Sequence, residues 1–397
     1  MRILCLAPKS PLPDNSGSRR RILRLTEAAS QDHDTLLVVA TRRLSSDDAA
    51  ALASTTSVQA EVVELPLASP GIAARGRWLA GRGDPLSWQR IDVVHASAAI
   101  GATISRFRPD AVWCTSATMA GVLLRDLQVP LVVDVAHVEG STIDSQLRRA
   151  VRSRSHLKPS LVLGADRAAR RAAERRGFSM ASLLTPCSDV EAAGARRVLD
   201  RPMAVIPNGV DLPDALGWTA SSRQLLFVSN FGYAPNREAF RLLVDDVLPR
   251  LRRVEPNSTV VAAGPGLASD DPLAQRPGVD ARGFVDDLAP LYQAAGLVIA
   301  PVMSGSGTNI KVIEAFAYGV PVVTTPMGIE GLDVRADVHV SVGATADTLA
   351  ARATELFAEP AMADRQRRAA RAVVERDLGW DRIGAAFVAA LRRISEA

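Results

Sequence analysis

The chain has 397 residues, of which 47% are hydrophobic and 23% charged, and its net charge is +4. This length is too great for one comfortable core and suits two globular domains of about 150–200 residues each. The three cysteines are few and far apart, and no apolar run approaches the roughly 20 residues of a membrane-spanning helix. These features predict a cytoplasmic protein without a disulfide framework.

The first half of the chain alternates short apolar runs with helical stretches. Apolar runs without polar alternation, separated by helices, are typical of a parallel sheet that is covered on both faces. The expected strands are residues 3–7, 35–40, 61–65, 111–114, 130–135 and 182–185, and the expected helices are residues 17–30, 89–106, 119–127 and 160–176.

A basic stretch lies between Arg148 and Arg176, where ten Arg and Lys residues accompany only two acids, Asp166 and Glu174. Such a patch would suit a peripheral contact with anionic headgroups at the inner membrane face, or a polyanionic acceptor. The alternative is a solvated helical face in an arginine-rich chain. Nucleic-acid binding is disfavoured, because no aromatic stacking residues are interleaved with the charges.

The second half repeats the alternation from Arg223 onward. The expected strands are residues 225–229, 259–263, 279–282, 297–300, 320–324 and 339–342, and the expected helices are residues 236–252, 286–294, 310–318, 346–358 and 362–377. Two consecutive halves of this kind predict an α/β fold of two doubly wound, Rossmann-like domains that face each other across a cleft. We expect domains at residues 1–202 and 203–379, and a last helix, 380–397, that packs back on the first domain.

Ligands of such sheets bind beyond the carboxyl ends of the strands. The most informative motif follows the strand expected at 297–300: Gly305-Ser306-Gly307-Thr308-Asn309-Ile310-Lys311 leads into a helix that contains Glu314. The first backbone amides of a helix lack partners within the helix, so a glycine-rich turn before a helix is an anion site. Lys311 lies where the helix dipole disfavours a cation, a position that a bound phosphate would explain.

The alternative for Lys311 and Glu314 is a surface pair at i,i+3, although lysine before glutamate is the less favourable order. Only three of the 47 Lys and Arg residues are lysines. Because the chain uses arginine at nearly all other basic positions, the lysine at position 311 favours the phosphate interpretation.

Three segments carry a resemblance to a known family. They are Val205-Ile206-Pro207-Asn208-Gly209-Val210-Asp211 at the expected join, Gly283-Phe284-Val285 before a helix, and residues 307–325 with Gly328-Ile329-Glu330-Gly331-Leu332 beyond them. The chain resembles the retaining family 4 glycosyltransferases (glycosyl transferases group 1) of the two-domain GT-B architecture. Residues 227–236 are similar to a bacterial subgroup that makes envelope or exopolysaccharide sugars.

The resemblance implies metal-independent, cofactor-free transfer of a sugar from a nucleotide-diphosphate sugar to a glycan, lipid-linked or small-molecule acceptor. Glu314 would bind the ribose hydroxyls and Lys311 would neutralise the departing diphosphate, while His137 would contact the transferred sugar unless it is a structural histidine. These three are the candidate catalytic residues. The candidate donor-binding residues are Gly17, Asn230, Phe231, Gly264, Val285, Gly305, Ser306, Gly307, Thr308, Asn309 and Ile310.

Two departures from the family pattern bear on activity. Ser306 stands where many members have an acid, and Asn230 and Pro235 stand where many have an Arg and a Lys that face the diphosphate. Arg237 is a candidate substitute. These departures leave open a non-catalytic homologue that binds a nucleotide sugar, and a nucleotide-sugar epimerase is a further alternative.

No metal site is expected from the sequence. The acids occur as the adjacent pairs Asp245-Asp246, Asp270-Asp271 and Asp286-Asp287, and adjacent side chains on a helix point in different directions. We interpret Asp286 as a helix N-cap. The donor base, the sugar, the acceptor and the oligomeric state are not specified by any of these patterns.

Overall fold

The computed structural model describes residues 1–12, 16–42, 58–69, 84–136, 157–214, 217–304 and 307–395, with residues 52, 71, 76 and 78 described singly. The chain forms two compact units. The first comprises Met1–Pro207 together with Ile383–Ala397, and the second comprises Asn208–Arg382.

The first unit is built on a parallel sheet in the order β3-β2-β1-β4-β5-β6. Its strands are β1 (Arg2–Ala7), β2 (Asp34–Thr41), β3 (Gln59–Glu64), β4 (Ala111–Cys114), β5 (Leu131–Val135) and β6 (Leu183–Pro186). Its helices are α1 (Gly17–Asp32), α4 (Val93–Phe107), α5 (Ala117–Leu123), α7 (Leu157–Met180), α8 (Asp189–Val198) and most of α15 (Trp380–Ser395).

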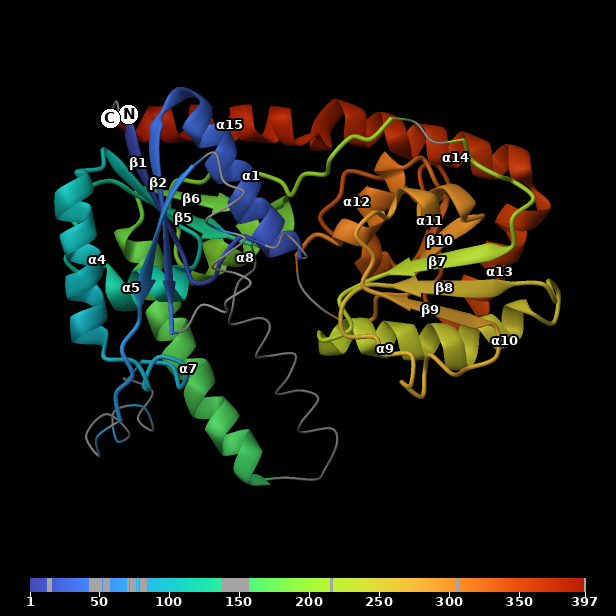
Figure 1. The fold of residues 1–397 in the computed structure, drawn as a ribbon, viewed down its shortest axis with the longest axis horizontal. Coiled ribbons are helices and arrows are strands. Elements are labelled where there is room, and N and C mark those ends of the chain that lie inside the picture. The colour runs from blue at the N-terminus through green and yellow to red at the C-terminus, as the bar shows by residue number, and fades with distance from the viewer. Residues whose placement is uncertain are drawn as a thin grey trace. The chain divides into compact units, whose positions relative to one another are not determined.

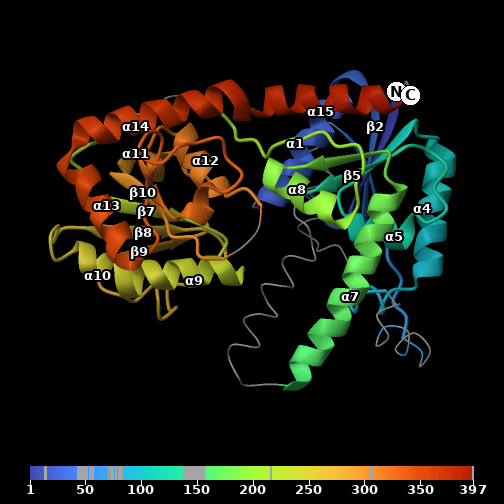
Figure 2. The same ribbon diagram turned by 180° about the vertical axis from the view of Figure 1, so that it is seen from behind.

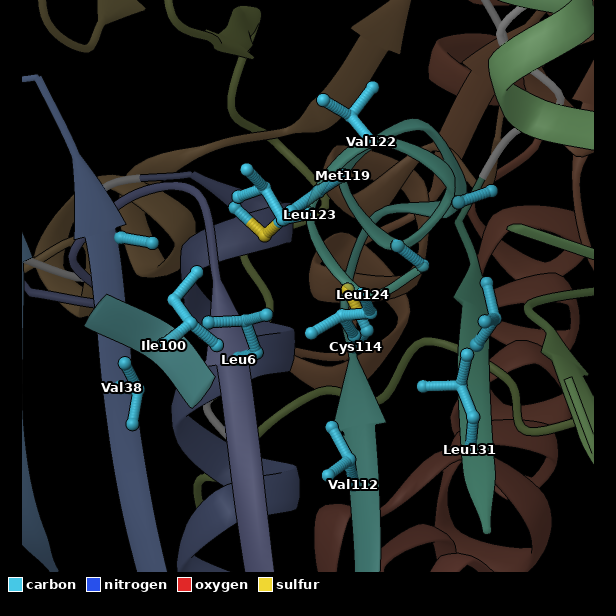
Figure 3. Close-up of a cluster of buried hydrophobic side chains, with 14 of the residues drawn as sticks. Leu6, Val38, Ile100, Val112, Cys114, Met119, Val122, Leu123, Leu124 and Leu131 are labelled. Atoms are coloured by element: carbon cyan, nitrogen blue, oxygen red, sulfur yellow. The ribbon is translucent and has the colours of Figure 1, made fainter. Parts of the chain in front are cut away.

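Helices cover both faces of this sheet (Figure 1). One face carries a cluster that includes Leu6, Val38 and Val112, which packs with Ile100 of α4 and Met119 of α5 (Figure 3). The near-continuous burial of β1, β4 and β5 reflects this two-sided cover, because alternate residues of each strand point to opposite faces.

The last helix completes the other face of the first unit. The Phe387 ring of α15 lies 4.7 Å, centroid to centroid, from the Trp113 ring of β4, and both side chains are fully buried. Gly384 lies so close to α1 that an added Cβ would be 2.5 Å from the Cβ of Ala28. This contact explains why a residue without a side chain stands there.

A buried ion pair joins α1 to β5 in the same unit. The Arg21 guanidinium donates from Nε and Nη2 to the two carboxylate oxygens of Asp134, at 2.9 and 2.7 Å, and from Nη1 to the carbonyl of Pro207 at 2.8 Å. The Thr185 hydroxyl donates to Asp134 Oδ1 at 3.0 Å. Burial alone would lower the pKa of Arg21, but the charge and hydrogen bonds of Asp134 outweigh it and raise that pKa.

The second unit contains a parallel sheet in the order β12-β11-β10-β7-β8-β9. Its strands are β7 (Gln224–Val228), β8 (Thr259–Ala263), β9 (Val279–Gly283), β10 (Leu297–Ala300), β11 (Val322–Thr324) and β12 (Ser341–Val342). Its helices are α9 (Ala234–Leu242), α10 (Leu248–Leu251), α11 (Ala289–Ala294), α12 (Ile310–Ala317), α13 (Ala346–Ala358) and α14 (Pro360–Val373), with a 3₁₀ turn at Pro326–Ile329.

Two hydrophobic clusters lie on opposite faces of this second sheet. One includes Phe227 and Phe240 and packs beneath α9, α10 and α13, and the other includes Val298 and Val312 and packs beneath α11, α12 and α14. Figure 1 shows this layering, and Figure 2 shows it from behind.

The predicted α/β fold of two Rossmann-like domains is confirmed, and every strand expected from the sequence is present. Two details differ. The single helix expected at residues 236–252 is divided by a π-helical segment, Leu243–Val247, between α9 and α10. Asp286 is not a helix N-cap: α11 begins at Ala289, and Asp287 is the residue whose Oδ1 accepts from the Ala289 amide, at 2.9 Å.

No helix in the described part of the chain is long and apolar enough to cross a membrane.

Candidate functional site

The start of α12 lies beyond the carboxyl end of β10. Gly307 has a φ of +78°, in the left-handed region that favours glycine, and Asn309 is the N-cap residue. The Asn309 side chain does not cap the helix; its Nδ2 donates to the Met327 carbonyl at 3.0 Å. No acid lies in the first turn. The helix start therefore presents backbone amides and the positive end of its dipole without an acidic side chain beside them.

Lys311 lies in this first turn and its side chain is half-buried. Lys311 Nζ donates to Asn236 Oδ1 at 2.7 Å and lies 5.4 Å from the centre of the Phe227 ring. Among the described residues no carboxylate lies within ion-pair distance of it. Burial lowers the pKa of the Lys311 ammonium to about 8. A partly buried cation whose described neighbours are an amide oxygen and a ring face is suited to receiving an anion.

Asn236 links Lys311 to the turn after β7. Its Nδ2 donates to the Asn230 carbonyl at 2.8 Å, while Asn230 Oδ1 accepts from the Gly232 amide at 2.9 Å. The predicted donor-binding residue Asn230 therefore shapes this turn through its own side chain. The Phe231 ring is buried against the Phe227 ring, with centroids 5.7 Å apart, and the Phe231 amide donates to the Pro265 carbonyl at 2.8 Å, so this predicted donor-binding residue has a packing role.

Gly264 permits a close approach between two strand ends. Its φ is +136°, and a Cβ at this position would lie 1.9 Å from the Ser229 carbonyl oxygen. The predicted site residue Gly264 thus has a steric role at the carboxyl ends of β7 and β8, where the loops that follow these strands lie together.

Glu314 lies one turn after Lys311 on α12. Its Oε2 accepts a hydrogen bond from the Tyr292 hydroxyl at 3.1 Å. The Tyr292 ring is fully buried and stacks on Tyr318, with centroids 4.2 Å apart and planes 9° apart. These contacts fix the position of one carboxylate oxygen of Glu314.

The remaining predicted site residues are placed as follows. Val285 is half-buried in the loop between β9 and α11, beside Phe284, whose exposed fraction is 59%. Gly17 is the first residue of α1 in the first unit, where Lys9 Nζ donates to Ser18 Oγ at 2.6 Å. His137, Gly305 and Ser306 lie outside the described residues.

A pocket opens beside the start of α12, entirely within the second unit. Its walls come from four segments: Tyr233 and Asn236 at the start of α9, Val302 and Ser304 after β10, Gly307 and Asn309 before α12, and Met327 and Glu330 at the 3₁₀ turn. Of the predicted site residues, this pocket brings together Gly307 and Asn309, and Asn236 connects it to Lys311.

Sequence reasoning assigned no role to Asn236, Tyr292 or Glu330, although Asn236 and Glu330 lie within segments that carry the family resemblance. The partners of Asn236 and Tyr292 are far away in the chain, and among the described residues the Glu330 side chain has none, so no spacing rule identifies these residues. Arg237, the candidate substitute cation, pairs instead with Asp271 at 2.8 Å. Among the described residues no group of three or more His, Cys, Asp and Glu side chains is placed to hold a metal ion.

Comparison with known proteins places this geometry in a family context. Residues 16–209 match the family model described as "Glycosyl transferase 4-like domain", and residues 222–359 match that described as "Glycosyl transferases group 1". Glycogen synthase of Mycobacterium tuberculosis is 29% identical over 208 residues, which cover 46% of this chain and 47% of that protein. The chain thus spans about half the length of the curated relatives that it matches.

Solved structures match along nearly the whole chain. Sucrose-phosphate synthase from Thermosynechococcus elongatus superposes with a TM-score of 0.73 at 16% identity, covering 99% of both chains. HepE from Anabaena, solved in complex with UDP-glucose, gives 0.68 at 16% identity, covering 99% of this chain and 100% of that one. S. aureus TarM gives 0.70 at 9% identity, covering 100% and 99%. At these identities the likeness concerns the fold.

The two Rossmann-like units and the two family matches define the class of this chain: it carries two glycosyltransferase domains in a GT-B fold. Its first unit carries the glycosyl transferase 4-like domain and its second unit the group 1 domain.

Proposed function

We propose that the chain transfers a hexosyl group from a nucleotide-diphosphate sugar to an acceptor hydroxyl, with retention at the anomeric carbon and without a divalent metal. One observation carries the proposal: among the described residues, the partly buried Lys311 ammonium at the start of α12 has an amide oxygen, and no carboxylate, as its hydrogen-bond partner. A buried charge without a counter-charge costs free energy, and a bound diphosphate would supply the missing charge.

The electrostatic task of the reaction is to stabilise the diphosphate as it departs. Lys311 and the first amides of α12 would do so together, since the ammonium charge and the helix dipole act in the same direction. Glu314, with one oxygen held by Tyr292, would accept a hydrogen bond from a ribose hydroxyl of the nucleotide. Val285 would offer backbone groups to the base.

The transfer step follows from this placement of the leaving group. The bond between the anomeric carbon and the diphosphate oxygen breaks, and the bond to the acceptor oxygen forms on the same face of the sugar. The acceptor proton passes to the departing diphosphate. His137 is proposed to contact the transferred sugar, and Gly17 to let the loop before α1 approach the donor without a Cβ.

The relatives support a nucleotide sugar as the donor. HepE was solved in complex with UDP-glucose, and two further relatives are named glycogen synthase and sucrose-phosphate synthase. The acceptor class, whether glycan, lipid-linked or small molecule, rests on the family resemblance alone.

A second candidate, a non-catalytic homologue that binds a nucleotide sugar, is favoured by the Arg237–Asp271 ion pair, because this pairing neutralises the nearest substitute for the missing cations. Thermal stabilisation by UDP, GDP, ADP, dTDP and their sugar conjugates, measured on the wild type and on Lys311→Ala, tests binding. A ligand that binds only the folded state raises the melting temperature. Stabilisation of the wild type alone supports the site, and no stabilisation by any nucleotide contradicts it.

Turnover then separates the two candidates. Release of nucleoside diphosphate from the stabilising donor is expected for an enzyme, and its absence despite binding favours the non-catalytic homologue. Loss of turnover in EDTA would contradict metal independence. The anomeric proton coupling of the product, read by NMR, would report retention or inversion.

We further propose a peripheral contact of the arginine-rich stretch that includes α7 with the inner face of a membrane. In the described part of this stretch, Arg170 pairs with Asp166 and Arg176 pairs with Asp84, both within 3.0 Å. Other arginines of α7, Arg171 and Arg175, have exposed side chains. Co-sedimentation with vesicles containing anionic lipid, but not with neutral vesicles, is the expected result; equal recovery from both would contradict it.

A further inference from the structure

The pocket beside α12 contains one acid whose side chain has no partner. Among the described residues, the Glu330 carboxylate takes part in no hydrogen bond or ion pair, and it is exposed to the pocket. The other acid near this pocket, Glu238, accepts from the Ser304 hydroxyl at 3.0 Å. A free carboxylate in a polar pocket is available to a ligand.

The segment that carries Glu330 is fixed in place by several hydrogen bonds. The Met327 carbonyl accepts from Asn309 Nδ2 at 3.0 Å and from the Glu330 amide at 3.3 Å. The Thr325 hydroxyl accepts from the Gly328 amide at 3.2 Å and donates to the carbonyl of Val302. The backbone of Glu330 is therefore held in place relative to the start of α12 and the end of β10, which sets the point from which its side chain reaches into the pocket.

The charges of the pocket determine which part of a ligand Glu330 can face. Lys311 and the amides of the α12 start attract the diphosphate, whereas a carboxylate would repel it. Glu330 must therefore face a part of the ligand that carries hydrogen-bond donors and no negative charge. The hydroxyl groups of a sugar attached to the diphosphate meet both conditions, and a carboxylate can accept from two neighbouring hydroxyls at once.

We propose that this pocket receives the transferred sugar and that Glu330 accepts hydrogen bonds from its hydroxyl groups, which makes Glu330 a specificity-determining residue. The inference rests on the proposed function, since it assumes that the diphosphate binds at Lys311. It assigns a role to a residue that touches only the sugar half of the donor.

Calorimetric titration with matched ligand pairs tests the inference. The ligands are UDP and UDP-glucose, GDP and GDP-mannose, ADP and ADP-glucose, and dTDP and dTDP-glucose, and the variants are Glu330→Ala, Glu330→Gln and Lys311→Ala. Glu359→Ala is the matched control, because Glu359 is an exposed glutamate that does not cap its helix through its side chain.

For the nucleotide and sugar conjugate that bind the wild type, Glu330→Ala should weaken binding of the nucleotide sugar about 10- to 100-fold, which is the effect of losing hydrogen bonds to a charged acceptor. Affinity for the free nucleoside diphosphate should stay the same or rise slightly, because a negative charge has been removed. The nucleotide-sugar affinity of Glu330→Gln should lie between those of the wild type and Glu330→Ala, and that of Glu359→Ala should equal the wild-type value. The melting temperature of the unliganded variants shows that they are folded.

Other outcomes overturn the inference in distinguishable ways. Equal losses for the diphosphate and the sugar conjugate, or no loss for either, would refute the role of Glu330 while Lys311→Ala still shows the diphosphate site. Failure of the wild type to bind any nucleotide would remove the proposed function as well.

Discussion

The Asp134→Asn substitution would leave the Arg21 guanidinium buried without a counter-charge. Both side chains are almost completely enclosed, with exposed fractions of 2% and 3%, so water cannot replace the lost carboxylate. The new amide would also turn an NH₂ group toward the guanidinium, where two donors would meet. Removing one partner of a buried pair typically costs about 3–5 kcal/mol of unfolding free energy.

The structure supports a value within that range. Asp134 accepts two hydrogen bonds from Arg21 and one from Thr185. An asparagine keeps one oxygen acceptor, so the substitution removes at least one hydrogen bond between charged groups, which contributes about 1.5–3 kcal/mol, together with the counter-charge. Urea denaturation gives the change in unfolding free energy. Hydrogen exchange of the β1 and β5 amides shows whether the loss falls on the first unit, and the β7 and β8 amides should be unaffected.

A surface pair provides the control. Arg2 and Asp34 form an ion pair at 3.2 Å with exposed fractions of 42% and 58%, so Asp34→Asn should cost no more than about 1 kcal/mol. The double variant Arg21→Met with Asp134→Leu should recover most of the stability, because it removes both charges and leaves similar volumes. If Asp134→Asn costs no more than Asp34→Asn, the reasoning from burial is wrong.

Three further predictions follow from the packing and the charges. Nucleotide-sugar affinity should begin to fall as the pH rises above about 8, where the Lys311 ammonium loses its proton, and the affinity of Lys311→Ala should show no such fall in calorimetry. Phe387→Ala should lower the unfolding free energy by about 3–5 kcal/mol and speed hydrogen exchange in β1 and β4; unchanged exchange there would contradict the packing of α15. Gly264→Ala should destabilise the second unit by more than about 1 kcal/mol in urea unfolding, because its Cβ would meet the Ser229 carbonyl. By contrast Gly101→Ala, where nothing lies within 4 Å of the added Cβ, should stabilise α4 by up to about 1 kcal/mol.

The stability of the folded protein and its affinity for the ligand should change with pH in opposite directions. The folded state binds the Lys311 proton more weakly than the unfolded chain does, since burial lowers its pKa from 10.5 to about 8. The unfolded state therefore holds more protons between these two values, and stability from this group rises with pH across that window. Ligand affinity falls over the same window, so the two effects have opposite signs and can be separated.

The sheets were predictable because the sequences of buried parallel strands are continuous apolar runs. Residues 259–263 and 297–300, for example, match β8 and β10 at both ends. The motif at α12 was predictable for a related reason, as a glycine-rich turn between a strand and a helix is a local pattern. The expected N-cap at Asp286 was wrong because the helix begins three residues later, a choice that depends on packing.

The side-chain partners of the site were beyond sequence reasoning. Lys311 meets Asn236 across 75 residues and Glu314 meets Tyr292 across 22. Such pairs are set by the sheet order, which brings the loops after β7 and β10 together although they are far apart in the chain. Periodicity and spacing describe one element at a time and do not report which loops become neighbours.

The return of the last helix to the first unit has a consequence for folding during synthesis. Residues 383–397 belong to the unit that the ribosome makes first, and Phe387 fills a place in its core beside Trp113. The apolar surface beside Trp113 therefore stays uncovered in the first unit until the second unit and the last helix have been synthesised. During that interval the surface around Trp113 is where we expect a chaperone to bind or aggregation to begin.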